Sequence, residues 1–333
     1  MKKVILLLLI SILLVGCSNN SKKSVINNII SKYNKSSGYN LIGNLEITNN
    51  DEVYNYDVEV GYLKKDKYKV ILTNKSNGYI QIILKNDDGV YVLTPSLNKS
   101  FKFNSDWPYN NSQIYLYDAL INDIKGDKNI EFNKNSNNYI ITTSVNYPNN
   151  NKLVNQKITF NNKLKLKKIS VYDKNGVSNM NLVVKNISLS PKFNDDYFSL
   201  DNYINDSDES NNTKKSSKTS SLDDVIYPLV IPSGTKLASE DRVKKDSGER
   251  VIMSYEGDKS FLLVEETVDV FNEFTVIPSL GEPFQLMDTL GVMTDNSLSW
   301  SSGNTDYYLV SDVMNSEELI EVAQSIVGVI SMK

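Results

Sequence analysis

The side chains best suited to covalent or acid–base chemistry are scarce in this sequence. Histidine is absent, and the 333-residue chain has a single cysteine, Cys17. Histidine is the commonest general base and metal ligand, so Ser-His and Cys-His nucleophile arrangements and His/Cys zinc sites are excluded. A lone cysteine also excludes any disulfide within the chain. Chemistry based on carboxylates alone, as in glycosidases, is the enzyme class that stays open.

Two acidic pairs, Asp223-Asp224 and Glu265-Glu266, are the obvious candidates for such carboxylate chemistry. Adjacent residues on a strand point to opposite faces, so neither pair would hold its two carboxyls together. We interpret both pairs as solvated surface charge. The sequence therefore predicts a protein that is not an enzyme, with no catalytic residue, no metal site and no cofactor.

Cys17 has a specific chemical context. Lys2 and Lys3 are followed by an apolar run over residues 4–15, which is too short to span a bilayer and is typical of a signal peptide. The run ends in Leu-Val-Gly-Cys, which resembles the lipobox of bacterial lipoproteins. The resemblance implies diacylglycerol on the Cys17 thiol and cleavage between Gly16 and Cys17. Acyl chains contribute about 0.8 kcal/mol for each buried methylene, so such lipid would anchor the chain at the outer face of the membrane.

Composition narrows the class of partner. The formal net charge is −4 and no long basic block occurs, so we predict no nucleic-acid binding. The apolar fraction of 40% is enough for at least one packed core. The heavy use of Asn, Lys, Ile and Tyr is typical of an AT-rich genome and favours a Gram-positive source.

The chain divides into five predicted segments. Residues 1–16 are the signal peptide and 17–23 a polar tether. Residues 24–204 form a β-rich domain, and 222–333 a smaller second domain. Between them, residues 205–221 contain no apolar side chain, so we predict a flexible linker.

The β-rich domain is predicted to be an antiparallel meander of about ten strands with two helices. Asn77-Gly78, Asp88-Gly89 and Asn175-Gly176 mark hairpins. One helix is expected over 24–35 and another over 112–125, where Ser112 would cap the N-terminus. Such a long sheet must curl to bury one face, so we predict an unclosed half-barrel with the helices in its concave face.

Aromatic residues near the mouth of this half-barrel are the candidate ligand-binding residues. They are Phe101, Phe103, Trp107 and Tyr117. The alternative for Trp107 is a structural loop with its ring packed on the sheet. Phe101 and Phe103 alternate with Lys102 and so face one side. The alternative interpretation for these two residues is ordinary core packing.

Residues 24–204 resemble the LolA/LolB/RseB superfamily. The resemblance rests on the order helix, meander, helix and strands, and on the segment DGVYVLTP at 88–95, an acidic-Gly turn followed by an aromatic strand ending in proline. It implies an open barrel with helices as a lid over an apolar cavity. It also implies binding of lipoprotein acyl chains, or of a partner protein as in GerS-like lipoproteins.

The smaller domain is predicted to be α+β. Strands at 297–300 and 307–310 should pair around Gly303-Asn304, and a terminal helix should follow, with Asn315 and Glu318 as a capping box. The region is similar to an uncharacterised C-terminal domain of Gram-positive lipoproteins and to the small domain of RseB/MucB proteins.

Two functions follow as hypotheses. The first is a lipid-anchored, extracytoplasmic binding module for a hydrophobic ligand, such as a lipid or a lipoprotein acyl chain, or for an envelope protein. The second is a regulatory partner in envelope stress signalling, as in RseB, or in sporulation and germination. Anchoring argues against a free lipoprotein shuttle, because a shuttle must leave the membrane.

Overall fold

The computed structural model describes most of the chain beyond the predicted signal peptide. The described residues are 21–49, 52–64, 66–108, 111–147, 150–204, 222, 225–246, 248–286 and 289–331. The predicted cleavage and lipidation residues, Gly16 and Cys17, lie outside this set, as do most of the tether and the linker 205–221. No helix of the described residues combines the length and apolarity needed to span a membrane.

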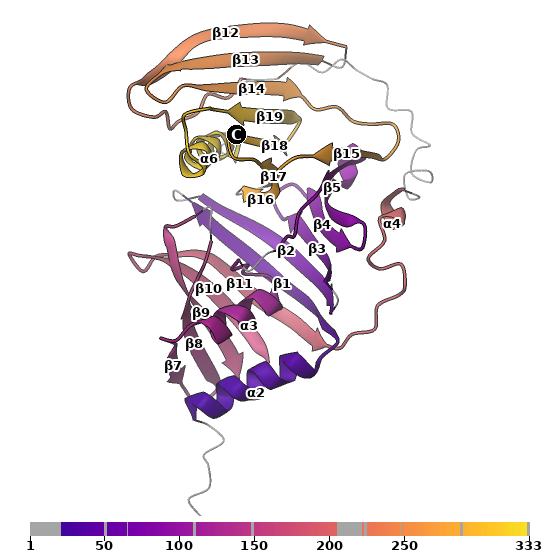
Figure 1. Cartoon of the computed structure of the whole chain (residues 1–333), viewed down its shortest axis with the longest axis vertical. Coiled ribbons are helices and arrows are strands. Elements are labelled where there is room, and N and C mark those ends of the chain that lie inside the picture. The colour runs from indigo at the N-terminus through magenta and orange to yellow at the C-terminus, as the bar shows by residue number, and fades with distance from the viewer. Residues whose placement is uncertain are drawn as a thin grey trace, which may run out of the picture.

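The first of two sheets has twelve strands and forms the lower half-barrel in Figure 1. Its order is β15-β6-β5-β4-β3-β2-β1-β11-β10-β9-β8-β7, so it ends at β15 and β7 and is unclosed. The strands of this sheet are β1 (Gly38–Asn49), β2 (Glu52–Leu63), β3 (Lys67–Asn74), β4 (Ile80–Asn86), β5 (Gly89–Thr94), β6 (Lys99–Phe103), β7 (Glu131–Lys134), β8 (Asn138–Ser144), β9 (Leu153–Asn161), β10 (Leu166–Asp173), β11 (Ser178–Leu189) and β15 (Thr275–Ser279).

Local sequence explains the hairpins of this sheet. Between β10 and β11, Gly176 takes a φ of 79°, a left-handed conformation that glycine adopts without a steric penalty. Asp173 closes the same turn, because its Oδ1 accepts hydrogen bonds from the backbone N–H groups of Asn175 and Val177 at 2.8 and 2.9 Å. The Asn-Gly signal at this turn is confirmed.

Two helices lie in the concave face of the half-barrel, as the sequence predicts (Figure 1). Helix α2 (Lys22–Lys35) buries Val25, Ile29 and Tyr33, which recur four residues apart along one stripe. Burial of three such side chains contributes roughly 5 kcal/mol. The mainly β fold class with an open sheet is therefore confirmed.

Helix α3 (Tyr117–Gly126) begins five residues later than predicted. Ser112 is not its cap: the residue at the N-cap is Leu116, which makes no side-chain capping bond. Ser112 instead exchanges backbone and side-chain hydrogen bonds with Asn146, at 2.9 and 2.7 Å. Because these bonds tie residue 112 to the end of β8, the segment before α3 is not helical.

The second sheet has seven strands in the order β12-β13-β14-β19-β18-β17-β16. Helix α6 (Ser316–Ser331) packs on one face of it (Figure 1). The strands of this sheet are β12 (Thr235–Lys245), β13 (Gly248–Gly257), β14 (Phe261–Thr267), β16 (Glu282–Leu286), β17 (Thr289–Met293), β18 (Ser297–Ser302) and β19 (Thr305–Val310). Two short helical segments are also described: η1 (Pro95–Leu97) precedes β6, and α4 (Asp201–Ile204) ends the first region.

The predicted capping box of α6 is confirmed. Glu318 donates its backbone N–H to Asn315 Oδ1 at 3.0 Å, and Asn315 donates its N–H to Glu318 Oε2 at 2.9 Å. The apolar stripe of the helix is fully buried against the sheet; it consists of Leu319, Val322, Ala323 and Ile326.

The two sheets are physically joined by β15. This strand belongs to the C-terminal half of the sequence, but it pairs in parallel with β6 at the edge of the first sheet. Backbone bonds extend the junction, since Thr275 donates to the Asn98 carbonyl at 2.8 Å and Phe271 donates to Leu97 at 3.2 Å. One continuous hydrophobic core runs through both sheets. Sequence periodicity gave no sign of this shared strand.

Candidate functional site

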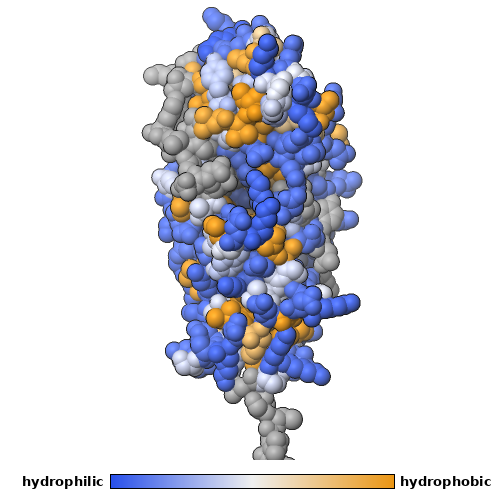
Figure 2. All heavy atoms as spheres, turned by 90° about the vertical axis from the view of Figure 1, so that its left-hand side faces the viewer, coloured by the Kyte–Doolittle hydropathy of each residue, from blue (hydrophilic) through white to orange (hydrophobic). Residues whose placement is uncertain are grey.

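A cavity of about 560 Å³ lies where the mouth of the half-barrel meets the second sheet and α6. Its floor comes from β1, β4 and β11 and from the loops before α3 and β9, and its roof from β16, β17 and α6. This volume is within the ~300–1,000 Å³ typical of small-molecule sites. Figure 2 shows the side on which α6 lies, where hydrophilic and hydrophobic atoms are intermingled.

The walls of the cavity combine apolar side chains with amides. The apolar members are Leu45, Ile47, Ile83, Trp107, Ile114, Leu153, Met180, Phe284, Leu290 and Ile320. Two buried amide oxygens, Asn179 Oδ1 and Gln285 Oε1, have no hydrogen-bond partner among the described residues. An unpaired buried acceptor costs about 1–3 kcal/mol, so both atoms favour a ligand that donates hydrogen bonds.

The rim of the cavity is acidic. Glu282, Glu317, Glu318 and Glu321 contribute to it, against the single lysine Lys152. Lys152 Nζ lies 3.7 Å from Glu321 Oε1 and so connects the half-barrel to α6. Both side chains are well exposed, and such pairs contribute at most about 1 kcal/mol. The rim therefore favours a neutral or cationic group at the entrance.

A partly buried carboxyl group, that of Asp123, stands behind one wall of the cavity. Asp123 Oδ2 accepts hydrogen bonds from Ser112 Oγ at 2.9 Å and from Gln156 Nε2 at 2.6 Å. Burial raises the pKa of Asp123 to about 6, although these two hydrogen bonds act in the opposite direction. Ser112 Oγ also accepts a hydrogen bond from the Asn146 N–H at 2.7 Å, so this group of polar side chains orders one wall of the cavity.

Gln81 fixes the roof of the cavity to its floor. From β4, its side chain donates to the Leu290 carbonyl at 3.2 Å and accepts from the Leu290 N–H at 2.5 Å. The amide thus pairs with β17 as a neighbouring strand would. Gln81 is buried, so both bonds form away from water.

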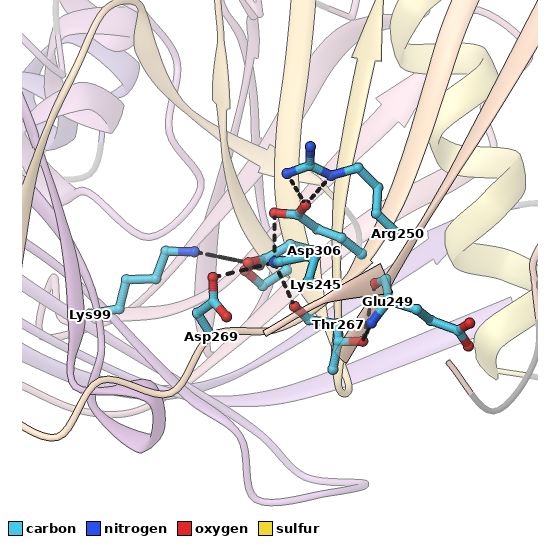
Figure 3. Close-up of polar contacts among 9 residues, drawn as sticks. Lys99, Lys245, Glu249, Arg250, Thr267, Asp269 and Asp306 are labelled. Atoms are coloured by element: carbon cyan, nitrogen blue, oxygen red, sulfur yellow. Dashed lines mark hydrogen bonds and ion pairs between the residues drawn. The ribbon is translucent and has the colours of Figure 1, made fainter. Parts of the chain in front are cut away.

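A buried ion pair makes a second connection between the sheets. Lys99 of β6 lies 3.2 Å from Asp306 of β19, and both side chains are at least 93% buried. Ser301 also donates a hydrogen bond to Asp306. Figure 3 shows Lys99 reaching toward Asp306 beside Lys245, Asp269 and Arg250. The removal of one partner from such a pair leaves an uncompensated buried charge.

The interpretation of Glu265-Glu266 as solvated surface charge is wrong, because both residues are buried. The two side chains do point to opposite faces of β14, but each is covered at this end of the strand. Glu266 pairs with Lys245 at 3.4 Å and Arg250 at 2.5 Å. Both oxygens of Glu265 accept from the backbone N–H of Ile226 at 3.1 Å. The other acidic pair, at 223–224, lies outside the described residues.

Of the four predicted ligand-binding residues, the structure places Trp107 at the cavity. Its ring also packs on Tyr68, with centroids 5.7 Å apart, so the structural alternative for this loop describes it as well. Phe103 is fully buried in the core. Phe101 is half-buried beneath the Lys99 amine, which lies 4.8 Å from its ring centre. Tyr117 is buried in the half-barrel and does not line the cavity.

Tyr117 belongs to a tyrosine cluster that surrounds a buried carboxyl, that of Asp118. Tyr39 and Tyr68 donate their hydroxyls to the two carboxylate oxygens of Asp118, at 2.6 and 2.8 Å. Burial raises the pKa of Asp118 above its usual range. The Tyr117 ring meets Tyr39 edge-on at 5.8 Å. These side chains fill the concave interior, so the cavity is confined to the barrel mouth.

Sequence reasoning missed Asn179, Gln285 and the α6 residues of the site. They come from β11, β16 and α6, which are far apart in the sequence, and asparagine is so abundant that no single one stands out. Among the residues that the structure describes, no group of three or more Asp, Glu, His or Cys side chains could hold a metal ion.

Comparison with known proteins gives one strong sequence match. The chain is 33% identical over 318 residues to the sporulation protein YdcC of Bacillus subtilis (strain 168), covering 95% of this chain and 94% of that protein. No family model matches.

Similar solved structures include the Pseudomonas aeruginosa MucA/MucB complex, with 10% identity, coverage of 90% and 96%, and a TM-score of 0.32. A LolA superfamily protein from Nitrosomonas europaea has 11% identity, coverage of 53% and 98%, and a TM-score of 0.30. The complex of the Clostridioides difficile CwlD amidase with the GerS lipoprotein has 16% identity, coverage of 54% and 99%, and a TM-score of 0.20. These are the groups that the sequence resemblance named.

Proposed function

This chain belongs to the family of the Bacillus subtilis sporulation protein YdcC, and from that premise we propose that it is a non-enzymatic binding protein of the sporulating cell envelope. Lipid on Cys17 would hold it at the outer face of the membrane, with residues 24–204 and 222–333 as its two units. The binding site would be the cavity between the half-barrel and α6.

The observation that supports this proposal is the cavity itself. About 560 Å³ of space is bordered by both sheets, lined by apolar side chains, and supplied with the unpaired acceptors Asn179 Oδ1 and Gln285 Oε1. A ligand with an apolar body and N–H or O–H donors would fill the space and satisfy these oxygens. The acidic rim would disfavour a ligand that carries a carboxylate or phosphate at the entrance.

A fluorescent probe can test the site. N-phenyl-1-naphthylamine has two apolar ring systems and one N–H donor, and its fluorescence rises in apolar surroundings. We expect the chain from residue 18 onward, which keeps every described residue, to bind it. Met180→Trp should fill the cavity and weaken binding at least tenfold, whereas Val177→Trp, at an exposed position on the neighbouring turn, should not.

The same two variants also show which result would contradict binding in the cavity. Equal probe affinity in Met180→Trp and the unaltered chain, with both folded by circular dichroism, would show that the cavity is not the binding site. Native mass spectrometry of protein purified from sporulating cells would then report whether any amphiphile is carried at all. A protein that carries none and binds no probe would contradict the ligand-binding role.

The anchor needs a separate test, because Gly16 and Cys17 lie outside the described residues. We expect the full-length chain to fractionate with membranes and to incorporate labelled fatty acid. Cys17→Ser should abolish the label while leaving the fold intact. Retention of the label in that variant would contradict lipidation at Cys17.

A regulatory partner role is the second candidate, and one surface feature favours it. Leu229, Val230 and Ile231 form an exposed apolar run in the segment that leads into β12, and Leu229 is 71% exposed. Such a run is suited to contact with another protein. Crosslinking in sporulating cells from a photoreactive residue at position 229 should capture one specific envelope protein, and capture of none would count against this role.

A further inference from the structure

Charge is segregated along the chain to an unusual degree. Residues 21–45 and 132–172 contain eleven lysines and no aspartate or glutamate. Residues 222–333 contain twenty acidic and seven basic side chains. The net charge of −4 conceals this asymmetry, and no single run of sequence displays it as a basic block.

The fold brings six of these eleven lysines together at one end of the molecule. Helix α2 lies at the lower end in Figure 1. Lys32 Nζ donates to the Lys163 carbonyl at 2.9 Å, and Lys22 donates to the Ile130 carbonyl. The first contact places α2 beside the turn between β9 and β10, and the second places its start beside the loop before β7. We call the resulting surface the lysine face; it consists of Lys22, Lys23, Lys32, Lys35, Lys163 and Lys165, all exposed.

The exposed side of α2 is polar. Its apolar stripe faces the sheet, and Lys23 and Lys35 flank the opposite side, with Asn27, Ser31 and Asn34 between them. The helix itself carries no carboxylate, and the one that acts electrostatically on Lys22 is Asp127 at the end of α3. The surface is therefore suited to a planar anionic partner held by charge, and it lacks the apolar residues needed for insertion into a bilayer.

We propose that the lysine face binds anionic phospholipid headgroups and so forms a second contact with the membrane. Helix α2 starts five residues after Cys17, so about 18 Å of extended chain would connect the two. The acidic C-terminal unit would be repelled by the same surface, which directs the cavity away from the membrane. This orientation rests on the proposed anchoring, but the headgroup binding does not.

Vesicle binding by the chain from residue 18 onward tests the headgroup contact without lipidation. Sedimentation with phosphatidylglycerol/phosphatidylcholine vesicles is compared with pure phosphatidylcholine vesicles. Lys23→Glu/Lys35→Glu is the test variant. Lys236→Glu/Lys244→Glu is its matched control, because both of its lysines are exposed on β12 and the charge change is equal.

We expect binding to the anionic vesicles alone. It should weaken in about 1 M salt, because charges more than about 3 Å apart are then largely screened from one another. Each lysine near an anionic surface is worth about a fivefold change in affinity, so the test variant should bind at least about 25-fold more weakly. The control should stay within about twofold.

Three results would overturn the inference. They are equal binding to neutral vesicles, an equal loss in the control variant, and tighter binding to a single-stranded oligonucleotide than to vesicles at the same phosphate concentration. None of them bears on the cavity, because the assay contains no cavity ligand. Loss of probe binding in Met180→Trp would likewise leave vesicle binding unchanged, so the two proposals can fail independently.

Discussion

Replacement of Glu265 by glutamine should make the protein more stable at alkaline pH and abolish part of its pH dependence. Glu265 is fully buried in β14, with Ile226 N–H as its hydrogen-bond donor. Burial raises its pKa from 4.5 to about 7, and the carboxylate of Glu240 adds to the rise, whereas the Ile226 N–H and Arg242 oppose it. Glutamine keeps the shape and one acceptor but cannot ionise.

The sign and size of the effect follow from this pKa. The folded state holds its proton more tightly than the unfolded chain, so the stabilising contribution is complete below pH 4.5 and is lost as the pH rises through 7. The difference between 4.5 and about 7 corresponds to about 3 kcal/mol, at about 1.4 kcal/mol for each pH unit. We therefore expect the stability advantage of Glu265→Gln to grow by about 1–3 kcal/mol between pH 4.5 and pH 8.

Urea denaturation at a series of pH values measures this change. Trp107 lies in the half-barrel and Trp300 in β18, so fluorescence reports on both sheets. Other carboxyls titrate over the same range, so the relevant quantity is the difference in unfolding free energy between the variant and the unaltered chain at each pH.

The neighbouring residue supplies the control. Glu266→Gln leaves Lys245 and Arg250 without their shared acid, so it should destabilise the protein at neutral pH. A difference between Glu265→Gln and the unaltered chain that stayed constant from pH 4.5 to pH 8 would refute the reasoning about Glu265.

Three further substitutions probe the junction and the last helix. Lys99→Met leaves Asp306 buried without its cationic partner and should lower the free energy of unfolding by about 3 kcal/mol. Lys99→Met/Asp306→Leu should recover this stability. Urea denaturation measures both variants, and a double variant no more stable than Lys99→Met would contradict the ion-pair account. Gln81→Leu should speed hydrogen exchange at the Leu290 amide by about tenfold or more, and unchanged exchange would argue against the amide pairing. Asn315→Ala removes the cap of α6 and should cost about 1 kcal/mol in thermal or urea unfolding, whereas a neutral effect would mean that the last helix depends on packing alone.

Local patterns were sufficient to predict a helix and a hairpin, and composition was sufficient to exclude histidine-based catalysis. The spacing of Val25, Ile29 and Tyr33 indicates a helix stripe, and the structure buries all three. Asn175-Gly176 indicates a hairpin, because a left-handed turn needs glycine. The missing histidines exclude whole enzyme classes without any fold. Each of these conclusions depends on residues within a few positions of one another, or on composition.

Helix α3 shows where local reasoning was insufficient. The residues from Ser112 onward have helical periodicity, but bonds from Ser112 to Asn146 and Asp123 compete with the capping role. A side chain that finds a distant partner is lost to the local motif. The same applies to Glu265, whose burial depends on segments that only the folded chain brings together.

The sequence by itself determined several strands and hairpin turns, the apolar stripes of α2 and α6 and the lipobox-like N-terminus. Only the tertiary structure decided that β15 joins the first sheet, that Asn179 and Gln285 meet in one cavity, and that Lys32 lies beside Lys163. The physical reason is the separation of the interacting residues along the sequence, because backbone preference and periodicity act over only a few residues. The cavity, the Lys99–Asp306 ion pair and the lysine face arise from contacts between residues more than a hundred positions apart, which no local pattern encodes.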